Sequence, residues 1–455
     1  MSAEPLAEYL PGPDFWGAEG WRPSDSMPPA ILEPEQRALS RGRQLLAEHE
    51  YEAAEFVSSP LLRNAQSYVR VMAGYYMGWA AWGRGILRSD IRDLPIDQST
   101  TFGRAMAHQM FAWHLRRRLD FPGHLKSLRT AVTEFLRCEP IPYYWLAVSL
   151  VPLLHTAFET ADEESFILGR QAFNACEWTA DLEHQRFDCL RALSRYSFTT
   201  GNVIAALKYI ADAKCCKLPH SCRAYALLHS ASYGLELNER MWVIEQLCSA
   251  ERLIEKERDE SCVGFRSVIL ALAMQYSEVD AHKAQGYLAE YHRIAPDQNT
   301  ASSHDKHLDI VADISLGKIG LSLEPQNQYA LEMIERSYSV AVSYGFRYRS
   351  SIAAAEIAGA QKKRGPREEW LEKALEQIAY YGDSSPLRKL LSRKMQLAHL
   401  TDSEKRAFSL VGAGKSNAEI AAQMCLTEGS VANILSAVYK KCGVTCRSAL
   451  ISQDT

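Results

Sequence analysis

Small and polar side chains recur at helical spacing near the C-terminal end of the chain, opposite a stripe of apolar side chains. The small and polar positions are Gly429, Ala432, Asn433, Ser436 and Lys440. The apolar positions are Val431, Ile434, Leu435, Val438 and Cys442, which fall at i, i+3, i+4, i+7 and i+11 of one helix. Such a helix buries its apolar stripe and leaves the small face free to approach another surface closely. On that face, the amide of Asn433 has the chemistry to pair bidentately with adenine in the major groove of DNA.

Ser and Thr residues mark the starts of the short helices that would position this face. Three pairs, each separated by three residues, are Thr401 and Glu404, Ser416 and Glu419, and Thr427 and Ser430. The first two pairs have the capping-box pattern, in which a hydroxyl accepts from a first-turn N–H and the Glu reaches back to the cap. A fourth helix is expected to start at Thr445. The sequence therefore predicts a compact helix-turn-helix whose third helix carries the exposed face.

This C-terminal segment, from Leu400 to about Ser452, resembles the DNA-binding domain of LuxR/FixJ-type bacterial transcription regulators. The matching residues are Leu400-Thr401, Glu404, Gly414, Ser416-Asn417, Glu419-Ile420-Ala421, Val431, Tyr439, Lys441, Gly443-Val444 and Arg447. The resemblance covers about an eighth of the 455 residues. It implies a four-helix domain that binds double-stranded DNA, as a homodimer paired through the last helix, Arg447 to Ser452. RNA polymerase is a candidate partner.

The predicted DNA-contacting set combines the exposed face with nearby cap and basic residues: Lys415, Ser416, Gly429, Ser430, Ala432, Asn433, Ser436, Lys440, Lys441 and Arg447. In this family the recognition helix commonly has the sequence Thr-Val-Lys-x-His, whereas here Ala432 stands at the Lys and Ile434 at the His. Residues 400–455 contain six Lys and Arg against five Asp and Glu. Because phosphate contacts supply most non-specific affinity, we expect the domain alone to bind DNA weakly.

Two observations bear on that weakness in opposite directions. Arg388, Lys389, Arg393 and Lys394 lie just upstream with no acidic residue among them, and they add positive charge beside the domain. The missing basic residues favour an alternative, in which a degenerate domain serves only dimerisation and the chain is a protein-interaction scaffold.

A short glycine-containing run imitates part of a phosphate-binding loop. The run Gly412-Ala413-Gly414-Lys415-Ser416 resembles the tail of a phosphate-binding P-loop, but Ser409 occupies the position of the first required glycine. Residues 402–411 also have helical rather than strand spacing. We therefore interpret Gly412 and Gly414 as the end of one helix and Ser416 as the cap of the next.

Overall composition gives little sign of nucleic-acid or membrane binding. The formal net charge is −4, so any affinity for DNA must be local. No apolar run approaches the roughly eighteen residues that a transmembrane helix needs, and the N-terminus lacks the pattern of a signal peptide. The eleven cysteines include no CxxC pair or Cys/His set with zinc spacing, so we expect reduced thiols in a cytoplasmic protein and no metal.

The rest of the chain is predicted to be all-α. Seven of the eighteen prolines fall in the first thirty-four residues, which predicts a flexible arm over 1–34. Over 35–390, helices alternate with short breaks, and helix pairs are expected to begin near His184, Ser221, Val263, His304 and Arg347. Their spacing of about forty residues predicts a helical-repeat solenoid. A linker over 391–399 would then join it to the helix-turn-helix domain at 400–455.

The repeats loosely resemble tetratricopeptide repeats, whose concave face binds peptides, proteins or small molecules. LuxR-type regulators with such repeats, the MalT-like proteins, also carry a nucleotide-binding module, and this chain lacks its motif and its length. An aromatic set between Tyr68 and Trp145 either lines a ligand site or, in our preferred interpretation, forms core. No catalytic motif is found. The sequence thus predicts a transcription regulator, not an enzyme and without a cofactor, whose repeats sense a signal or partner and control the helix-turn-helix.

Overall fold

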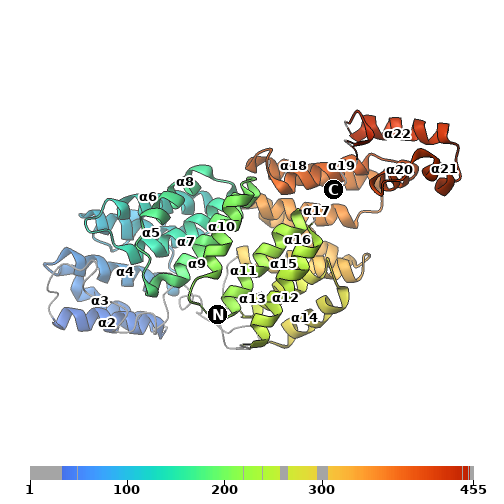
Figure 1. The fold of residues 1–455 in the computed structure, drawn as a ribbon. Coiled ribbons are helices and arrows are strands. Elements are labelled where there is room, and N and C mark those ends of the chain that lie inside the picture. Colours follow the sequence, from blue (N-terminus) through green and yellow to red (C-terminus); the bar gives the residue numbers. More distant parts are fainter. Residues whose placement is uncertain are drawn as a thin grey trace.

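The computed structural model describes residues 33–48, 50–218, 220–237, 239–256, 265–294, 306–442, 444–448 and 450. All regular elements in these residues are helices, and they contain no strand, which confirms the predicted all-α class (Figure 1). Within the same residues, no helix combines the length and the apolar character that a membrane crossing requires. The predicted proline-rich arm lies outside the described residues except for its last two positions.

The described residues form a long series of helices. The first part consists of α2 (Glu33–Ala47), α3 (Tyr51–Ser58), α4 (Ser67–Gly83), α5 (Thr101–Arg117), α6 (Phe121–Leu136), α7 (Tyr143–Thr160), α8 (Glu163–Ala175), α9 (Glu183–Thr199) and α10 (Val203–Lys214). It continues with α11 (His220–Glu236), α12 (Arg240–Lys256), α13 (Phe265–Tyr276), α14 (Ala281–Arg293), α15 (Lys306–Leu323), α16 (Gln328–Ser343), α17 (Arg347–Ala360), α18 (Arg364–Ile378) and α19 (Pro386–Ala398). Short 3-10 turns interrupt it at Ser59–Arg63, Ile91–Asp93, Ala180–Leu182 and Ala379–Tyr381.

Consecutive helices pack in pairs, as a helical-repeat solenoid requires. The pairs α5–α6, α9–α10, α11–α12, α13–α14, α15–α16 and α17–α18 are in extensive contact. The first helices of the last five pairs begin at 183, 220, 265, 306 and 347, each within two residues of the predicted position. Small residues allow the close packing expected of such pairs, since Ala353, Ala354 and Ala358 of α17 are almost completely buried.

Local sequence explains where several of these helices begin. The side chains of Asn202, Asp280 and Asn327 each accept a hydrogen bond from a first-turn N–H, and so cap α10, α14 and α16. Gly201 precedes the first of these caps with a φ of +92°, a left-handed conformation that glycine adopts without steric cost. Helix breaks in the sequence thus became turns in the fold.

The aromatic set in the first repeats forms core. Tyr75, Trp79, Trp113 and Trp145 are buried, and their rings meet edge-on or tilted, with centroids 5.2 to 6.2 Å apart. This burial confirms the interpretation of these four residues as core packing. Other members of the set, such as Tyr68 and Phe111, are partly buried and pack against the same core.

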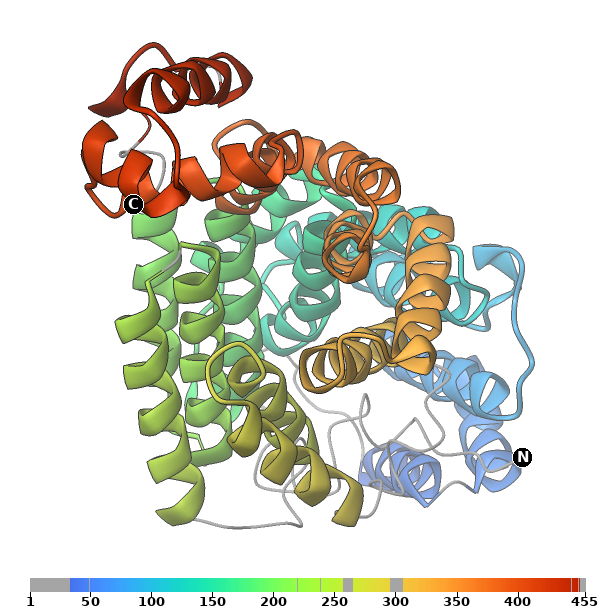
Figure 2. The same cartoon turned by 90° about the vertical axis from the view of Figure 1, so that its right-hand side faces the viewer.

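The series of repeats curves back on itself. Helix α17 contacts α7, and α19 contacts both α9 and α11, although these helices are far apart in sequence (Figures 1 and 2). One hydrophobic cluster accordingly joins Leu146, Leu150 and Leu193 of the early repeats to Tyr348, Leu387 and Leu391 near the end of the series. The last helices of the repeats are therefore fixed by the first half of the chain as well as by their neighbours.

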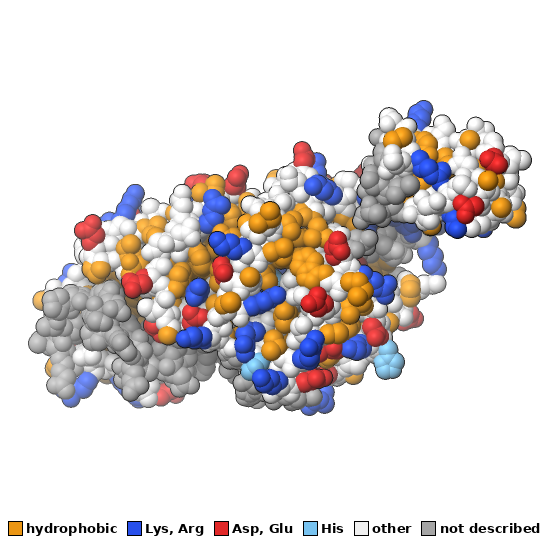
Figure 3. Space-filling view, in the orientation of Figure 1, with side chains coloured by type: hydrophobic (Ala, Val, Ile, Leu, Met, Phe, Trp, Pro, Cys, Tyr) orange, Lys and Arg blue, Asp and Glu red, His pale blue; other side chains and the backbone are white. Residues whose placement is uncertain are grey.

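Helix α19 occupies most of the segment predicted as a linker over 391–399. Its Leu387 and Leu391 are buried in the repeat core, whereas Leu397 packs against the core of the C-terminal region. After α19 come α20 (Asp402–Gly412), α21 (Asn417–Met424) and α22 (Glu428–Cys442), which project from the body of the repeats (Figure 3). One helix thus connects the two cores without an intervening loop.

Candidate nucleic-acid interface

Two capping boxes begin the first two C-terminal helices, as the sequence predicts. At α20, the Thr401 N–H donates to Glu404 Oε2 over 2.6 Å, and the Glu404 N–H donates to Thr401 Oγ1 over 3.3 Å. At α21, the Ser416 N–H donates to Glu419 Oε2 over 2.7 Å, and the Glu419 N–H donates to Ser416 Oγ over 3.3 Å. Each box satisfies otherwise unpaired N–H groups at a helix start, and so fixes where the helix begins.

The third helix begins with a simpler cap. The Ser430 N–H donates to Thr427 Oγ1 over 3.2 Å, and the two hydroxyls lie 2.9 Å apart. Cys425, with a φ of +56°, ends α21 and turns the chain toward this cap. The turn of the helix-turn-helix is therefore set by residues next to it in the sequence.

The P-loop-like run has the structure of a helix end. Helix α20 stops at Gly412, Gly414 takes a φ of +75°, and Ser416 caps α21. No strand precedes the run within the described residues, where α20 lies instead. The interpretation of the two glycines as a helix terminus is confirmed.

A separate hydrophobic core holds the three helices together. Four of the five residues of the predicted stripe on α22 are buried, namely Val431, Leu435, Val438 and Cys442, and Ile434 is half-buried against them. They pack on Ala407, Phe408 and Val411 of α20, Ile420 and Ala421 of α21, and Leu400 and Leu450. The apolar stripe thus fixes which face of α22 turns away from the core.

The opposite face of α22 is exposed to solvent. Gly429, Ala432, Asn433, Ser436 and Lys440 are all exposed, and Ser430 is half-buried. The side chains of Asn433, Ser436 and Lys440 have no hydrogen bond or ion pair within the described part of the chain. A face of small residues with a free amide suits close approach to base edges.

Three of the predicted basic residues are engaged within the domain. Lys441 Nζ lies 2.6 Å from Glu404 Oε2, and Lys415 Nζ lies 3.3 Å from Glu419 Oε1. Arg447 donates to Asn417 Oδ1 over 2.8 Å and also donates to the Lys415 carbonyl oxygen. Lys441 and Arg447 therefore tie helices together, and any phosphate that they bind would share them with these partners.

The bond between Lys441 and Glu404 links α22 to the start of α20. Burial alone would raise the pKa of the Glu404 carboxyl, but hydrogen bonds from Lys441 and Thr401 outweigh burial and lower it. Glu404 thus stays ionised while it serves both a helix cap and a helix-helix contact. The sequence signals its capping role through the spacing to Thr401, but gives no sign of the pairing with Lys441, which is 37 residues away.

Positive charge on this domain is sparse. On the face seen in Figure 3, acidic and basic side chains are interspersed and no large basic patch covers the domain. Beside the domain, Lys389 and Lys394 of α19 are exposed, whereas Arg388 pairs with Asp383 at 2.6 Å. Few unpaired cations are thus available for phosphate contacts near α22.

The predicted fourth helix is described only at its beginning. The chain is helical at Arg447 and Ser448, two residues later than expected, and the Leu450 N–H donates to the Cys446 carbonyl over 3.2 Å. The rest of the predicted pairing surface, through Ser452, lies outside the described residues.

Residues 398–453 match the GerE family model, described as bacterial regulatory proteins of the luxR family. The chain therefore carries a LuxR-type DNA-binding helix-turn-helix domain at its C-terminal end, after a region composed of helices. A comparison with curated proteins found no match for the chain. In the described residues, no group of three or more His, Cys, Asp and Glu side chains is arranged to hold a metal ion.

Proposed function

We propose that this protein is a transcription regulator that binds a specific duplex sequence through the N-terminal half of α22, under the control of its helical repeats. The observation that carries the proposal is the exposed, unpartnered face of α22 within the segment that matches the luxR family. Recognition helices of helix-turn-helix domains contact bases from their N-terminal half, where Asn433 lies. Asn433 is the proposed base-contacting residue, with Gly429, Ala432 and Ser436 allowing close approach.

The division of labour that we propose follows the predicted boundaries. Repeats at 35–390 take the input, and 400–455 bind DNA, with 391–399 carrying the change from one to the other. The helical connection supports this division, because α19 has Leu391 in one core and Leu397 against the other. A change in the packing of the last repeat would move the recognition helix with it. The input itself is a peptide, protein or small molecule held by the repeats.

We propose that DNA binding requires a homodimer. Lys415, Lys441 and Arg447 are engaged within the domain, so a single copy offers few cations to the phosphate backbone. Two copies on adjacent half-sites would multiply their individual affinities through effective concentration. RNA polymerase remains a candidate partner of the bound dimer.

The test is selection from random duplexes with the full-length protein. We expect enrichment of one sequence, and Asn433→Ala should weaken binding to it by about 1–3 kcal/mol and relax its specificity. Asn174→Ala, at an exposed position of α8 distant in the chain, is the matched control and should leave binding unchanged. If no sequence is enriched, the protein is better explained as a scaffold with a degenerate domain, which the internal engagement of its basic residues would also suit.

A further inference from the structure

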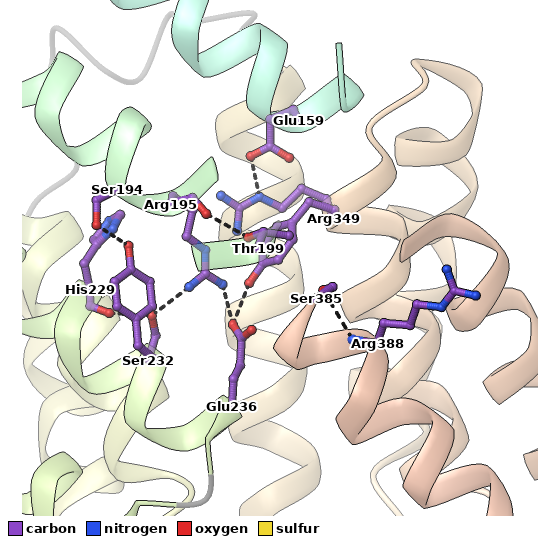
Figure 4. A network of polar contacts seen from close by, with 12 residues as sticks. Glu159, Ser194, Arg195, Thr199, His229, Ser232, Glu236, Arg349, Ser385 and Arg388 are labelled. Atoms are coloured by element: carbon purple, nitrogen blue, oxygen red, sulfur yellow. Dashed lines mark hydrogen bonds and ion pairs between the residues drawn. The ribbon is translucent and has the colours of Figure 1, made fainter. Parts of the chain in front are cut away.

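A charged pair joins two helices of the repeats through residues that are 190 positions apart in the sequence. Arg349 of α17 donates from Nε to Glu159 Oε1 of α7 over 2.9 Å (Figure 4). The Glu159 side chain is only 4% exposed. A buried carboxylate is strongly destabilised when its cation is removed, so this pair favours contact between α17 and α7 over separation.

A second contact joins α17 to α9 and α11 beside the first. Arg195 donates to Glu236 Oε1 over 2.6 Å (Figure 4). The Tyr348 hydroxyl donates to the same oxygen over 3.1 Å. The Arg195 guanidinium also lies over the Tyr348 ring, 4.6 Å from its centroid. Three helices from two distant parts of the chain thus converge on one carboxylate.

The start of α19 is fixed to the same early repeats. Tyr381, just before α19, donates its hydroxyl to the Phe158 carbonyl oxygen of α7. At the turn between α9 and α10, a Cβ built on Gly201 would lie 2.5 Å from the carbonyl oxygen of Ser384. The next residue, Ser385, caps α19 by accepting from the Arg388 N–H. The helix that leads to the DNA-binding domain is therefore positioned by α7 and by the turn after α9.

One buried carboxylate oxygen at these contacts is not compensated by a hydrogen bond in the described part of the chain. Glu236 Oε2 is buried and has no hydrogen-bond partner among the described residues. Burial raises the pKa of this carboxyl above its usual value even though Arg195 opposes the shift. A partly satisfied polar network stabilises the closed arrangement less than a complete one would. Specific side-chain pairs therefore hold the repeats closed. Opening them would remove the free-energy cost of burying the Glu236 carboxyl.

We propose that α17 is a latch: its contacts with Glu159 and Glu236 close the repeats on themselves, and opening them frees α19 and changes the placement of the DNA-binding domain. The latch is a property of the repeats alone, whereas its effect on DNA binding rests on the proposed function. No contact within the C-terminal domain has to change for the latch to act, because α19 carries that domain as a unit.

The first measurement is hydrogen exchange in the full-length protein. Glu159→Gln removes the charge of the latch at nearly constant shape, and Gly201→Ala wedges the α9–α10 turn away from Ser384. Both should speed exchange in α17 and α19 by about tenfold or more while leaving α5 and α6 unchanged. The controls are Glu164→Gln, which breaks the exposed pair with Arg129, and Gly85→Ala, which strains a similar positive φ with no atom within 4 Å.

The second measurement is affinity for the duplex selected above. Both latch variants should shift the affinity in the same direction by about fivefold or more, a modest allosteric coupling, and the controls should not. Unchanged exchange in α17 and α19 of the Glu159→Gln variant would overturn the latch, whatever Gly201→Ala does, and faster exchange at unchanged affinity would reduce the latch to a structural tether. If the unmodified protein binds no duplex, the proposed function fails, while the exchange rates still decide whether the latch exists.

Discussion

The contacts that fix the helices of the C-terminal domain and the contacts that close the repeats span very different separations along the sequence. In the domain, the fixing contacts join residues 3 to 37 positions apart, from the capping boxes to the Lys441–Glu404 pair. The contacts that close the repeats span much larger separations: 112 positions from Tyr348 to Glu236, 190 from Arg349 to Glu159, and 223 from Tyr381 to Phe158. The domain can therefore keep its shape wherever it is placed, whereas its placement depends on contacts that close a long loop.

The largest expected effect tests whether the two regions unfold separately. Leu435→Ala removes a buried side chain from the core of the C-terminal domain and should destabilise that domain by about 2–5 kcal/mol. Because this core is distinct from that of the repeats, calorimetry should show an earlier transition for the domain and an unshifted one for the repeats. A shift of all transitions together would show that the two regions are one cooperative unit.

Acid should separate the same two regions. Burial, with Arg88 and Arg117 nearby, lowers the pKa of His114 to about 4, from an ordinary 6.5. The unfolded chain then binds more protons, so stability is present above pH 6.5 and is lost as the pH falls toward 4. At pH 4.5 the loss from His114 is about 2–3 kcal/mol, at about 1.4 kcal/mol per pKa unit.

His108 and His229 also have pKa values lowered first by burial, so they add to this loss with the same sign. Residues 400–455 contain no histidine, and Glu404, with its lowered pKa, loses its contribution only below its ordinary 4.5. Between pH 6.5 and 4.5, the unfolding temperature of the repeats should therefore fall, whereas that of the C-terminal domain should not. His114→Gln should reduce the dependence of the stability of the repeats on pH. An equal loss of stability in both regions would contradict this assignment.

A smaller effect distinguishes the two capping boxes within the domain. Glu404→Gln weakens one of the two hydrogen bonds of its capping box and also weakens the pair with Lys441. It should lower the free energy of unfolding of the domain by about 1–2 kcal/mol. Glu419→Gln changes the same motif at an exposed position and should have a smaller effect. Chemical denaturation of the two variants measures the difference. Equal losses would mean that the link between α20 and α22 contributes nothing beyond capping.

The smallest effect concerns the missing charge on α22. Ala432→Lys should strengthen binding to all duplexes and make the fall of log-affinity with log salt steeper by about 0.9 per domain, the value for one phosphate contact. Binding titrations at several salt concentrations measure the slope. Asp402→Asn, which changes charge by the same amount at the exposed start of α20, is the matched control. Equal steepening in both variants would show that net charge, not a contact from position 432, controls the affinity.

Much of the domain was predictable because its determinants are close together in the sequence. The spacing of Thr401 to Glu404 and of Ser416 to Glu419 predicted both capping boxes, and the period of Val431, Leu435 and Val438 predicted the buried face of α22. The starts of the helix pairs were predictable for the same reason, since caps and glycine or proline breaks act within one turn of a helix. The family resemblance located the matched segment to within two residues of Leu400 at its start.

The sequence by itself thus determined the helices, their buried faces and the face of α22 that carries Asn433, because each depends on neighbours within a few residues. Only the tertiary structure decided which charges pair and how the repeats close. Lys441 and Arg447 were predicted as DNA contacts from their charge and the family resemblance, and the fold gives each a partner inside the domain. Nothing in the local sequence links Arg349 to Glu159, since that distance is set by the accumulated curvature of all the helix pairs between them.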